Sequence, residues 1–166
     1  MNKEEVLDLV LKSYMRYYDI NKETPAAPFK CEAVFKSHNE RYFLVKSAKI
    51  QDIDSNEYVF FALEDSLSIE RLLELDKTAW EEGLSRVEPK EGHRNSDVTL
   101  IIISDRIDQN AFNLVKRLKH SKSYKFNFWG WSNYRLVAME LSLNRFATNR
   151  QGSELKKLFN NIKNSL

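Results

Sequence analysis

Residues 123–141 read SYKFNFWGWSNYRLVAMEL, and this stretch decides how the centre of the fold is expected to form. Its first part, residues 124–128, alternates aromatic and polar side chains with the two-residue period of a half-buried strand. A glycine between two tryptophans then marks a turn within residues 129–133. Residues 134–141 are apolar, β-branched or aromatic enough for a second strand. The stretch therefore predicts a β-hairpin with a tryptophan-flanked corner.

Strands and helices are expected on both sides of this hairpin. The predicted strands are residues 29–37, 41–51, 57–63 and 97–104, with a short edge strand around Phe146. The predicted helices begin at Asn2, at Ser66 or Ser68, at Asp108 and at Ser153. Residues 98–128 pass from strand through helix to strand, which permits a parallel pair with a right-handed crossover. The order αβββαβαββα predicts an α+β or α/β protein with one mixed sheet of five to six strands and about four helices.

Length and composition are those of one globular domain over residues 1–166. The sequence has neither an apolar run of roughly 20 residues nor a signal peptide, so we expect a cytoplasmic protein with no membrane partner. Four scattered glycines exclude the clustered glycines of phosphate-binding and dinucleotide-binding loops. The single cysteine, Cys31, falls on the apolar side of a predicted strand and is interpreted as a small buried thiol. We expect no catalytic, cofactor-binding or metal-binding residue.

Charge is distributed unevenly along the chain. Residues 1–105 carry a formal charge of −7 and residues 106–166 a charge of +9, which together give the net charge of +2. Such a division is typical of a cationic binding surface, and equally of two halves of one fold that face each other with complementary charge. The sequence does not choose between these two interpretations.

The basic stretch of residues 116–125 is the main functional candidate. It lies directly before the aromatic hairpin, and cations that hold phosphates beside aromatics that stack on bases are typical of a nucleic-acid surface. The alternative is that lysines at a helix C-terminus only complement its dipole. The candidate residues for binding an anionic partner are Lys116, Arg117, Lys119, His120, Lys122, Lys125, Trp131 and Arg135.

A second hypothesis comes from the order of the first six elements, αβββαβ, which is similar to the restriction-endonuclease-like nuclease core. Such nucleases hold divalent cations on carboxylates, with a lysine beside the scissile phosphate. Glu64 and Asp65 close a predicted strand and are the candidate acidic site, but Ser66 and Leu67 follow where a lysine is needed. The order of the elements suggests a diverged nuclease, but the sequence lacks the lysine that the catalytic site needs.

Four segments resemble a known family. RYFLVKSAKI (41–50), NEYVFF (56–61), KSYKFNFWGWSNYRL (122–136) and TNRQGSELKKLF (148–159) are similar to short, single-domain bacterial proteins known only as a domain of unknown function. The similarity covers nearly the whole chain, and its most distinctive part is the Gly-Trp-Ser segment with the Thr-Asn-Arg segment. The resemblance implies a bacterial, stand-alone protein and assigns no role to any residue.

Three functional hypotheses follow. The first is a non-catalytic binding or regulatory domain for an anionic partner, either nucleic acid or an acidic protein. The second is a diverged metal-dependent nuclease that uses Glu64 and Asp65. The third is protein–protein association, including a homodimer, through the exposed part of the hairpin.

Overall fold

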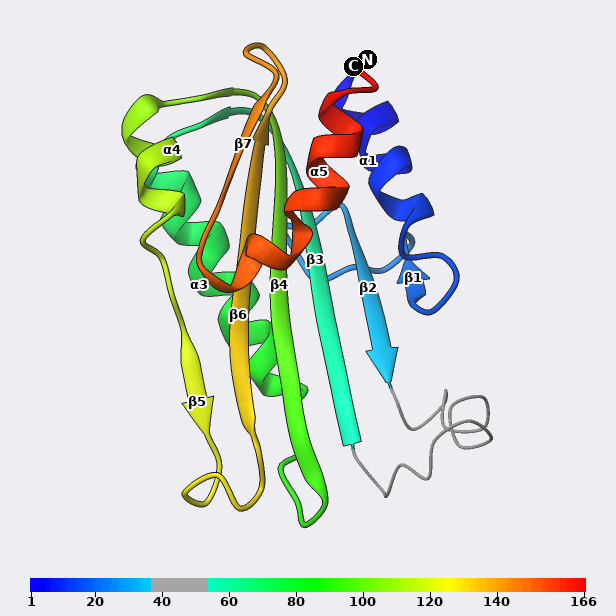
Figure 1. Cartoon of the computed structure of the whole chain (residues 1–166), viewed down its shortest axis with the longest axis vertical. Coiled ribbons are helices and arrows are strands. Elements are labelled where there is room, and N and C mark those ends of the chain that lie inside the picture. Colours follow the sequence, from blue (N-terminus) through cyan, green and yellow to red (C-terminus); the bar gives the residue numbers. More distant parts are fainter. Residues whose placement is uncertain (37–53) are drawn as a thin grey trace.

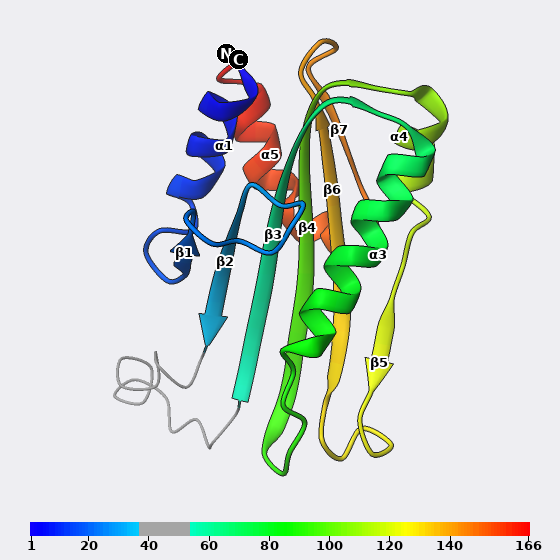
Figure 2. The ribbon, with the colours of Figure 1, turned by 180° about the vertical axis from the view of Figure 1, so that it is seen from behind.

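The computed structural model describes residues 1–36 and 54–166. These residues form a mixed seven-stranded β-sheet with helices on both faces (Figures 1 and 2). The strands are β1 (Asp19–Asn21), β2 (Cys31–Lys36), β3 (Asp54–Leu67), β4 (His93–Ile107), β5 (Ser121–Ser123), β6 (Trp131–Glu140) and β7 (Arg145–Thr148). The helices are α1 (Lys3–Lys12), α3 (Ile69–Ser85), α4 (Gln109–Val115), the 3₁₀ turn η1 (Gln151–Leu155) and α5 (Lys156–Lys163).

The strand order is β1-β2-β3-β4-β6-β5, with β7 paired to the far end of β6. β1, β2 and β3 are antiparallel, and β3, β4 and β6 are parallel to one another. α3 connects β3 to β4, and α4 lies on the connection from β4 to β6, as parallel neighbours require. β5 and β7 both pair antiparallel with β6, β5 at its Trp131 end and β7 at its Glu140 end.

Two hydrophobic clusters fill the two faces of the sheet. Alternate residues of the central strands point to opposite sides, so that Phe60 packs under α3 and α4 while Phe61 packs under α1 and α5. Figure 2 shows α3 lying along one face, and Figure 1 shows α1 and α5 on the other. The central strands are therefore buried on both sides, which explains their continuous apolar runs.

The helices α1 and α5 cover only part of their face. β4 has 15 residues and, at about 3.3 Å per residue, spans roughly 50 Å, whereas the ten residues of α1 rise only about 15 Å. In Figure 1 the lower half of β3, β4 and β6 extends beyond both helices. Among the described elements no helix covers that half of the face.

Two predicted helix starts are confirmed. Asn2 Oδ1 accepts a hydrogen bond from the Glu5 backbone N–H, and Glu5 Oε2 accepts one from the Asn2 backbone N–H, both at 2.9 Å. Ser68 caps α3 by accepting from the Arg71 backbone N–H at 3.1 Å. In the described residues no helix is long and apolar enough to cross a membrane.

The mixed α+β sheet is confirmed, and the details differ in several places. The strand predicted at residues 41–51 lies outside the described residues. β1 was not predicted, and β3 and β4 are longer than the predicted strands 57–63 and 97–104 because polar residues continue both of them. The helix that begins at Asn2 ends at Lys12.

The prediction that residues 124–128 form the first strand of the hairpin is wrong. β5 pairs with β6, but it ends at Ser123, and the chain then forms a loop that the hydrogen bond from Tyr124 N to Gly130 O closes at 2.9 Å. Lys125, Phe126 and Asn127 all have positive φ angles, of 45°, 52° and 71°, which no strand contains. The alternation of aromatic and polar residues therefore belongs to a loop tip and does not mark a buried strand face.

Candidate functional site

Five of the predicted cations are spread along the segment that runs from the end of α4 through β5 to the loop before β6. Within the described residues, none of the five forms an ion pair with a carboxylate. All five are exposed, and three of them lie over aromatic rings: Lys116 over Phe112, Lys122 over Tyr124 and Lys125 over Trp129. We call this the basic β5 surface, which consists of Lys116, Arg117, Lys119, Lys122 and Lys125 together with the exposed rings of Phe126 and Phe128.

The loop tip presents two phenyl rings to solvent. Phe126 is 93 % exposed and Phe128 is 83 % exposed, although large apolar side chains are usually buried. The loop is held at its base, where His93 Nδ1 lies 2.5 Å from the Trp129 carbonyl oxygen and Gly130, with a φ of 85°, passes close to the backbone of Arg94. Positive φ angles at three successive non-glycine residues are strained, and such strain is often found at functional sites.

His120 lies beside this surface and has a partner in the core. Its Nε2 lies 2.8 Å from Asp76 Oδ2, and its ring stacks on Trp80 with 5.2 Å between the ring centroids. The contact holds the segment that leads into β5 against α3. His120 therefore fixes the position of the segment that carries the basic β5 surface, and it is not one of the exposed cations of that surface.

Arg135 lies on the opposite side of the sheet from α4. It alternates along β6 with Tyr134 and Leu136, which face α3 and α4, so its guanidinium points to the face of α1 and α5. Trp131 is 38 % exposed and, by the same alternation, shares the face of Arg135. The predicted set is thus divided between two faces.

The predicted acidic site at the end of β3 is occupied by ion pairs. Arg71 donates to Glu64 through Nε at 3.0 Å and through Nη2 at 2.8 Å. Lys3 donates to Asp65 at 2.6 Å, and this hydrogen bond holds the pKa of the Asp65 carboxyl below its ordinary value. The residues that the structure describes contain no group of three side chains that could hold a metal ion.

A second polar site lies at the boundary of the uncovered half of the sheet, where Arg135 is surrounded by carboxylates. Its guanidinium lies 3.4 Å from Glu57, 3.1 Å from Asp97 and 3.2 Å from Glu154. Glu57 also accepts hydrogen bonds from Thr99 Oγ1 at 2.8 Å and from the Tyr18 hydroxyl. A cavity of about 310 Å³ opens beside this cluster between α1, η1 and the sheet, and we call it the Arg135 pocket.

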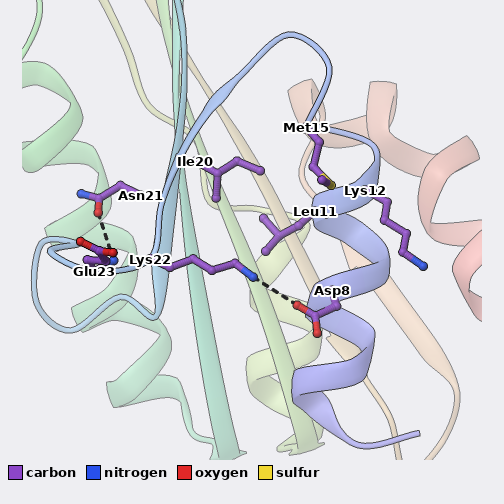
Figure 3. Close-up of a pocket in the computed structure, with 8 residues that line it drawn as sticks. All are labelled: Asp8, Leu11, Lys12, Met15, Ile20, Asn21, Lys22 and Glu23. Carbon is purple, nitrogen blue, oxygen red and sulfur yellow. Dashed lines mark hydrogen bonds and ion pairs between the residues drawn. The ribbon is translucent and has the colours of Figure 1, made fainter.

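A wider groove of about 770 Å³ lies between α1 and β1 (Figure 3). Its floor contains Leu11 and Ile20, and Lys22 reaches across it to Asp8 at 3.4 Å. Both partners of that ion pair are well exposed, so it contributes little to stability.

The chain matches one known protein family. Residues 2–161 match the family described as a domain of unknown function (DUF8052). The chain belongs to this family. The match confirms the resemblance to a family of unknown function, and it assigns no activity. The searches of curated proteins and of solved structures found no match.

Sequence reasoning missed the Arg135 pocket in this DUF8052 chain. Its lining residues come from the segment after α1, from β3 and β6, and from η1 and α5, which only the complete fold brings together. A weak signal exists, because Glu57 and Asp97 each stand at the start of an apolar strand run and Thr99 interrupts one. A polar residue inside a strand that is otherwise buried on both faces indicates a local change of surroundings.

Proposed function

We propose that this protein is a non-catalytic binding domain that holds single-stranded nucleic acid on the basic β5 surface. The observation that supports the proposal is a run of five exposed cations, unpaired with carboxylates among the described residues, along the segment that leads from α4 to a loop tip with two exposed phenyl rings. A cytoplasmic location, where such a partner is present, belongs to the same proposal.

The physical argument begins with charge. Each lysine or arginine that neutralises a phosphate releases a condensed counterion, which favours binding at low salt. Lys116 to Lys125 supply this term along one short segment, and no acidic residue occurs in that segment. The affinity of the surface should therefore depend strongly on ionic strength.

The phenyl rings favour single strands over duplex. Unpaired bases can stack on aromatic side chains, and each stacked base contributes about 1–3 kcal/mol, whereas the bases of a duplex are already stacked on each other. Phe126 and Phe128 stand at a loop tip, where flanking bases can reach them. The cations would hold the backbone and the rings would hold the bases.

The test is a fluorescence-anisotropy titration of a labelled single-stranded oligothymidine. With about five phosphates neutralised, raising salt from about 50 to 200 mM should weaken binding roughly 100-fold. A duplex of the same length should bind more weakly than the single strand. Affinity that does not change with salt contradicts the proposal.

Variants separate the charge contribution from the stacking contribution. Lys119→Gln with Lys122→Gln should weaken binding and reduce the salt slope by about 1.4, while Phe126→Ser with Phe128→Ser should weaken binding at least roughly 10-fold with the slope unchanged. The matched control is Lys156→Gln with Lys157→Gln, two exposed lysines of α5. Equal losses in the control would show that only net charge matters, against a defined surface.

The same samples test the other hypotheses. We expect the oligonucleotide to stay intact with Mg²⁺ or Mn²⁺, and cleavage that Glu64→Ala abolishes would support the diverged nuclease instead. Polyglutamate that binds as tightly as the oligonucleotide would indicate an acidic protein partner. A concentration-dependent dimer in sedimentation, lost in the Phe126→Ser and Phe128→Ser variant, would assign the phenyl rings to self-association.

A further inference from the structure

The Arg135 pocket is a second candidate binding site, independent of the basic β5 surface. It lies where the uncovered half of the sheet meets the C-terminal end of α1 and the η1–α5 segment. Its volume of about 310 Å³ is at the lower end of the range of small-molecule sites. Leu155 and Leu158 form an apolar wall, and Tyr14, Tyr18, Glu57 and Arg135 form the polar side.

The carboxylates of this site already have partners. Glu57 accepts from Thr99 and Tyr18 and pairs with Arg135. Behind it, Asp97 accepts from the Asn133 backbone N–H at 3.2 Å and from Asn95 Nδ2 at 3.0 Å, besides its bond from Arg135. A ligand therefore gains little from these acceptors.

Two donors lack a partner among the described residues. The Tyr14 hydroxyl and Arg135 Nε are both inaccessible to solvent and make no hydrogen bond there. Tyr14 is 5 % exposed, and both side chains line the pocket. Burying a polar group without a partner costs about 1–3 kcal/mol, so such groups are rare and require an explanation.

The charges around the pocket restrict the ligand. Three carboxylates, from Glu57, Asp97 and Glu154, surround the single guanidinium of Arg135, so an anionic ligand is repelled. The Tyr14 hydroxyl remains a donor, because burial and the charge of Glu57 raise its pKa well above the ordinary value, although Arg135 acts in the opposite direction. The two unpartnered donors therefore require a ligand whose acceptor atom carries no negative charge.

We propose that the Arg135 pocket binds a small uncharged molecule whose carbonyl oxygen displaces the side chains that cover the Tyr14 hydroxyl and Arg135 Nε and accepts hydrogen bonds from both. The apolar part of the molecule packs against Leu155 and Leu158. Recognition of this kind satisfies both unpartnered donors and leaves the carboxylate cluster intact.

The test uses nicotinamide and nicotinate as probes, because they have nearly the same shape and differ in charge. Saturation-transfer NMR and calorimetry on the full chain should detect nicotinamide with a Kd of about a millimolar, as a ligand of this size allows. Nicotinate should bind at least roughly 10-fold more weakly. Equal or tighter binding of nicotinate, or no binding of nicotinamide, overturns the inference.

Tyr14→Phe removes one donor and keeps the ring. It should weaken nicotinamide binding roughly 10-fold, as expected for one lost hydrogen bond. Tyr17→Phe is the matched control, since Tyr17 lies on the neighbouring segment, is exposed and does not line the pocket, and it should bind nicotinamide normally. Binding that Tyr14→Phe leaves unchanged overturns the inference.

A second measurement does not depend on the probe. Without ligand, Tyr14→Phe should leave the melting temperature unchanged or raise it, because the substitution removes an unpartnered buried hydroxyl. A fall of more than about 3 °C, the size expected for a lost hydrogen bond in a domain of this length, would show that the hydroxyl already has a partner. That result would also overturn the inference.

Discussion

At the scale of single residues, buried charge in this protein is compensated by close pairing. Glu32 is 4 % exposed, and Arg86 donates to its two oxygens at 2.8 and 2.9 Å. The backbone N–H of Ala26 adds a third hydrogen bond at 2.7 Å. Burial acts to raise the pKa of Glu32, but the hydrogen bonds from Arg86 and Ala26 outweigh it and hold the pKa below its ordinary value.

This pair predicts a pH-dependent stability. Because the pKa of Glu32 is lower in the folded than in the unfolded chain, its stabilisation is complete above the unfolded value of about 4.3 and is lost as pH falls through the folded value. Glu32→Gln should cost about 1–3 kcal/mol at neutral pH, since it leaves Arg86 with only the more exposed carboxylate of Glu82 as a charged partner. Urea unfolding should show the difference from wild type shrinking below about pH 4.

The exposed Glu88 provides the control for this experiment. Glu88→Gln should change stability by less than about 0.5 kcal/mol at either pH. A Glu32→Gln penalty that stays constant on acidification would show that the loss arises from packing and not from the carboxylate charge.

Cys31 gives a second prediction at this scale. It is 1 % exposed, and burial raises the pKa of its thiol to about 11. At about pH 8 the folded protein should react with a disulfide reagent at least roughly 100-fold more slowly than the denatured protein, because little thiolate is present and access is blocked. The reaction is followed by absorbance. Equal reaction rates for the folded and the denatured protein would contradict the interpretation of Cys31 as a buried thiol.

At the scale of elements, α3 approaches β4 so closely that one position requires glycine. A Cβ added at Gly83 would lie 2.4 Å and 2.8 Å from the two methyl groups of Val98, which is completely buried. Alanine favours helix interiors over glycine by about 1 kcal/mol, so helix propensity alone predicts that Gly83→Ala stabilises the protein. The packing against Val98 predicts instead that Gly83→Ala destabilises the protein.

We therefore expect Gly83→Ala to destabilise the fold by about 1–3 kcal/mol, as overpacking does. A double-mutant cycle with Val98→Ala in urea unfolding isolates the cause, because removing the valine methyls should remove most of the alanine penalty. A penalty of the same size in both backgrounds would place the strain elsewhere.

Local signals predicted some of these elements and not others. Ser68 and Asn2 identify helix starts because a cap depends only on neighbouring residues. The cations of the basic β5 surface were candidates because they lie within ten residues of the chain. The loop tip was misread, since alternating aromatic and polar residues such as Phe126 and Asn127 look the same in a strand and in an exposed loop. The Arg135 pocket depends on strand pairing, which no local pattern contains.

At the scale of the whole molecule, both hydrophobic clusters are built on the same strands. Neighbouring residues of β3, β4 and β6 contribute to opposite clusters, so neither cluster can form without the central sheet. We expect one cooperative unfolding transition over residues 1–166, seen at the same urea concentration by far-UV circular dichroism and tryptophan fluorescence. Two separated transitions would contradict a single domain.

Some cations of the basic part of the chain are paired with carboxylates of the acidic part, and others are not. Arg135, from the basic part of the chain, pairs with Glu57 and Asp97 from the acidic part. The cations of the basic β5 surface form no such pairs among the described residues. Pairing between the acidic and the basic parts of the chain therefore accounts for Arg135 but not for the cations of the basic β5 surface.

The most direct measurement of the proposed function is a ¹H–¹⁵N NMR titration of the full chain with a single-stranded oligothymidine at low salt. The account predicts chemical-shift changes concentrated at residues 116–131, with α1 and β1 at the far end of the sheet unaffected, and reversal of the changes on adding salt. Changes spread evenly over the surface, confined to the Arg135 pocket, or absent would contradict nucleic-acid binding by the basic β5 surface.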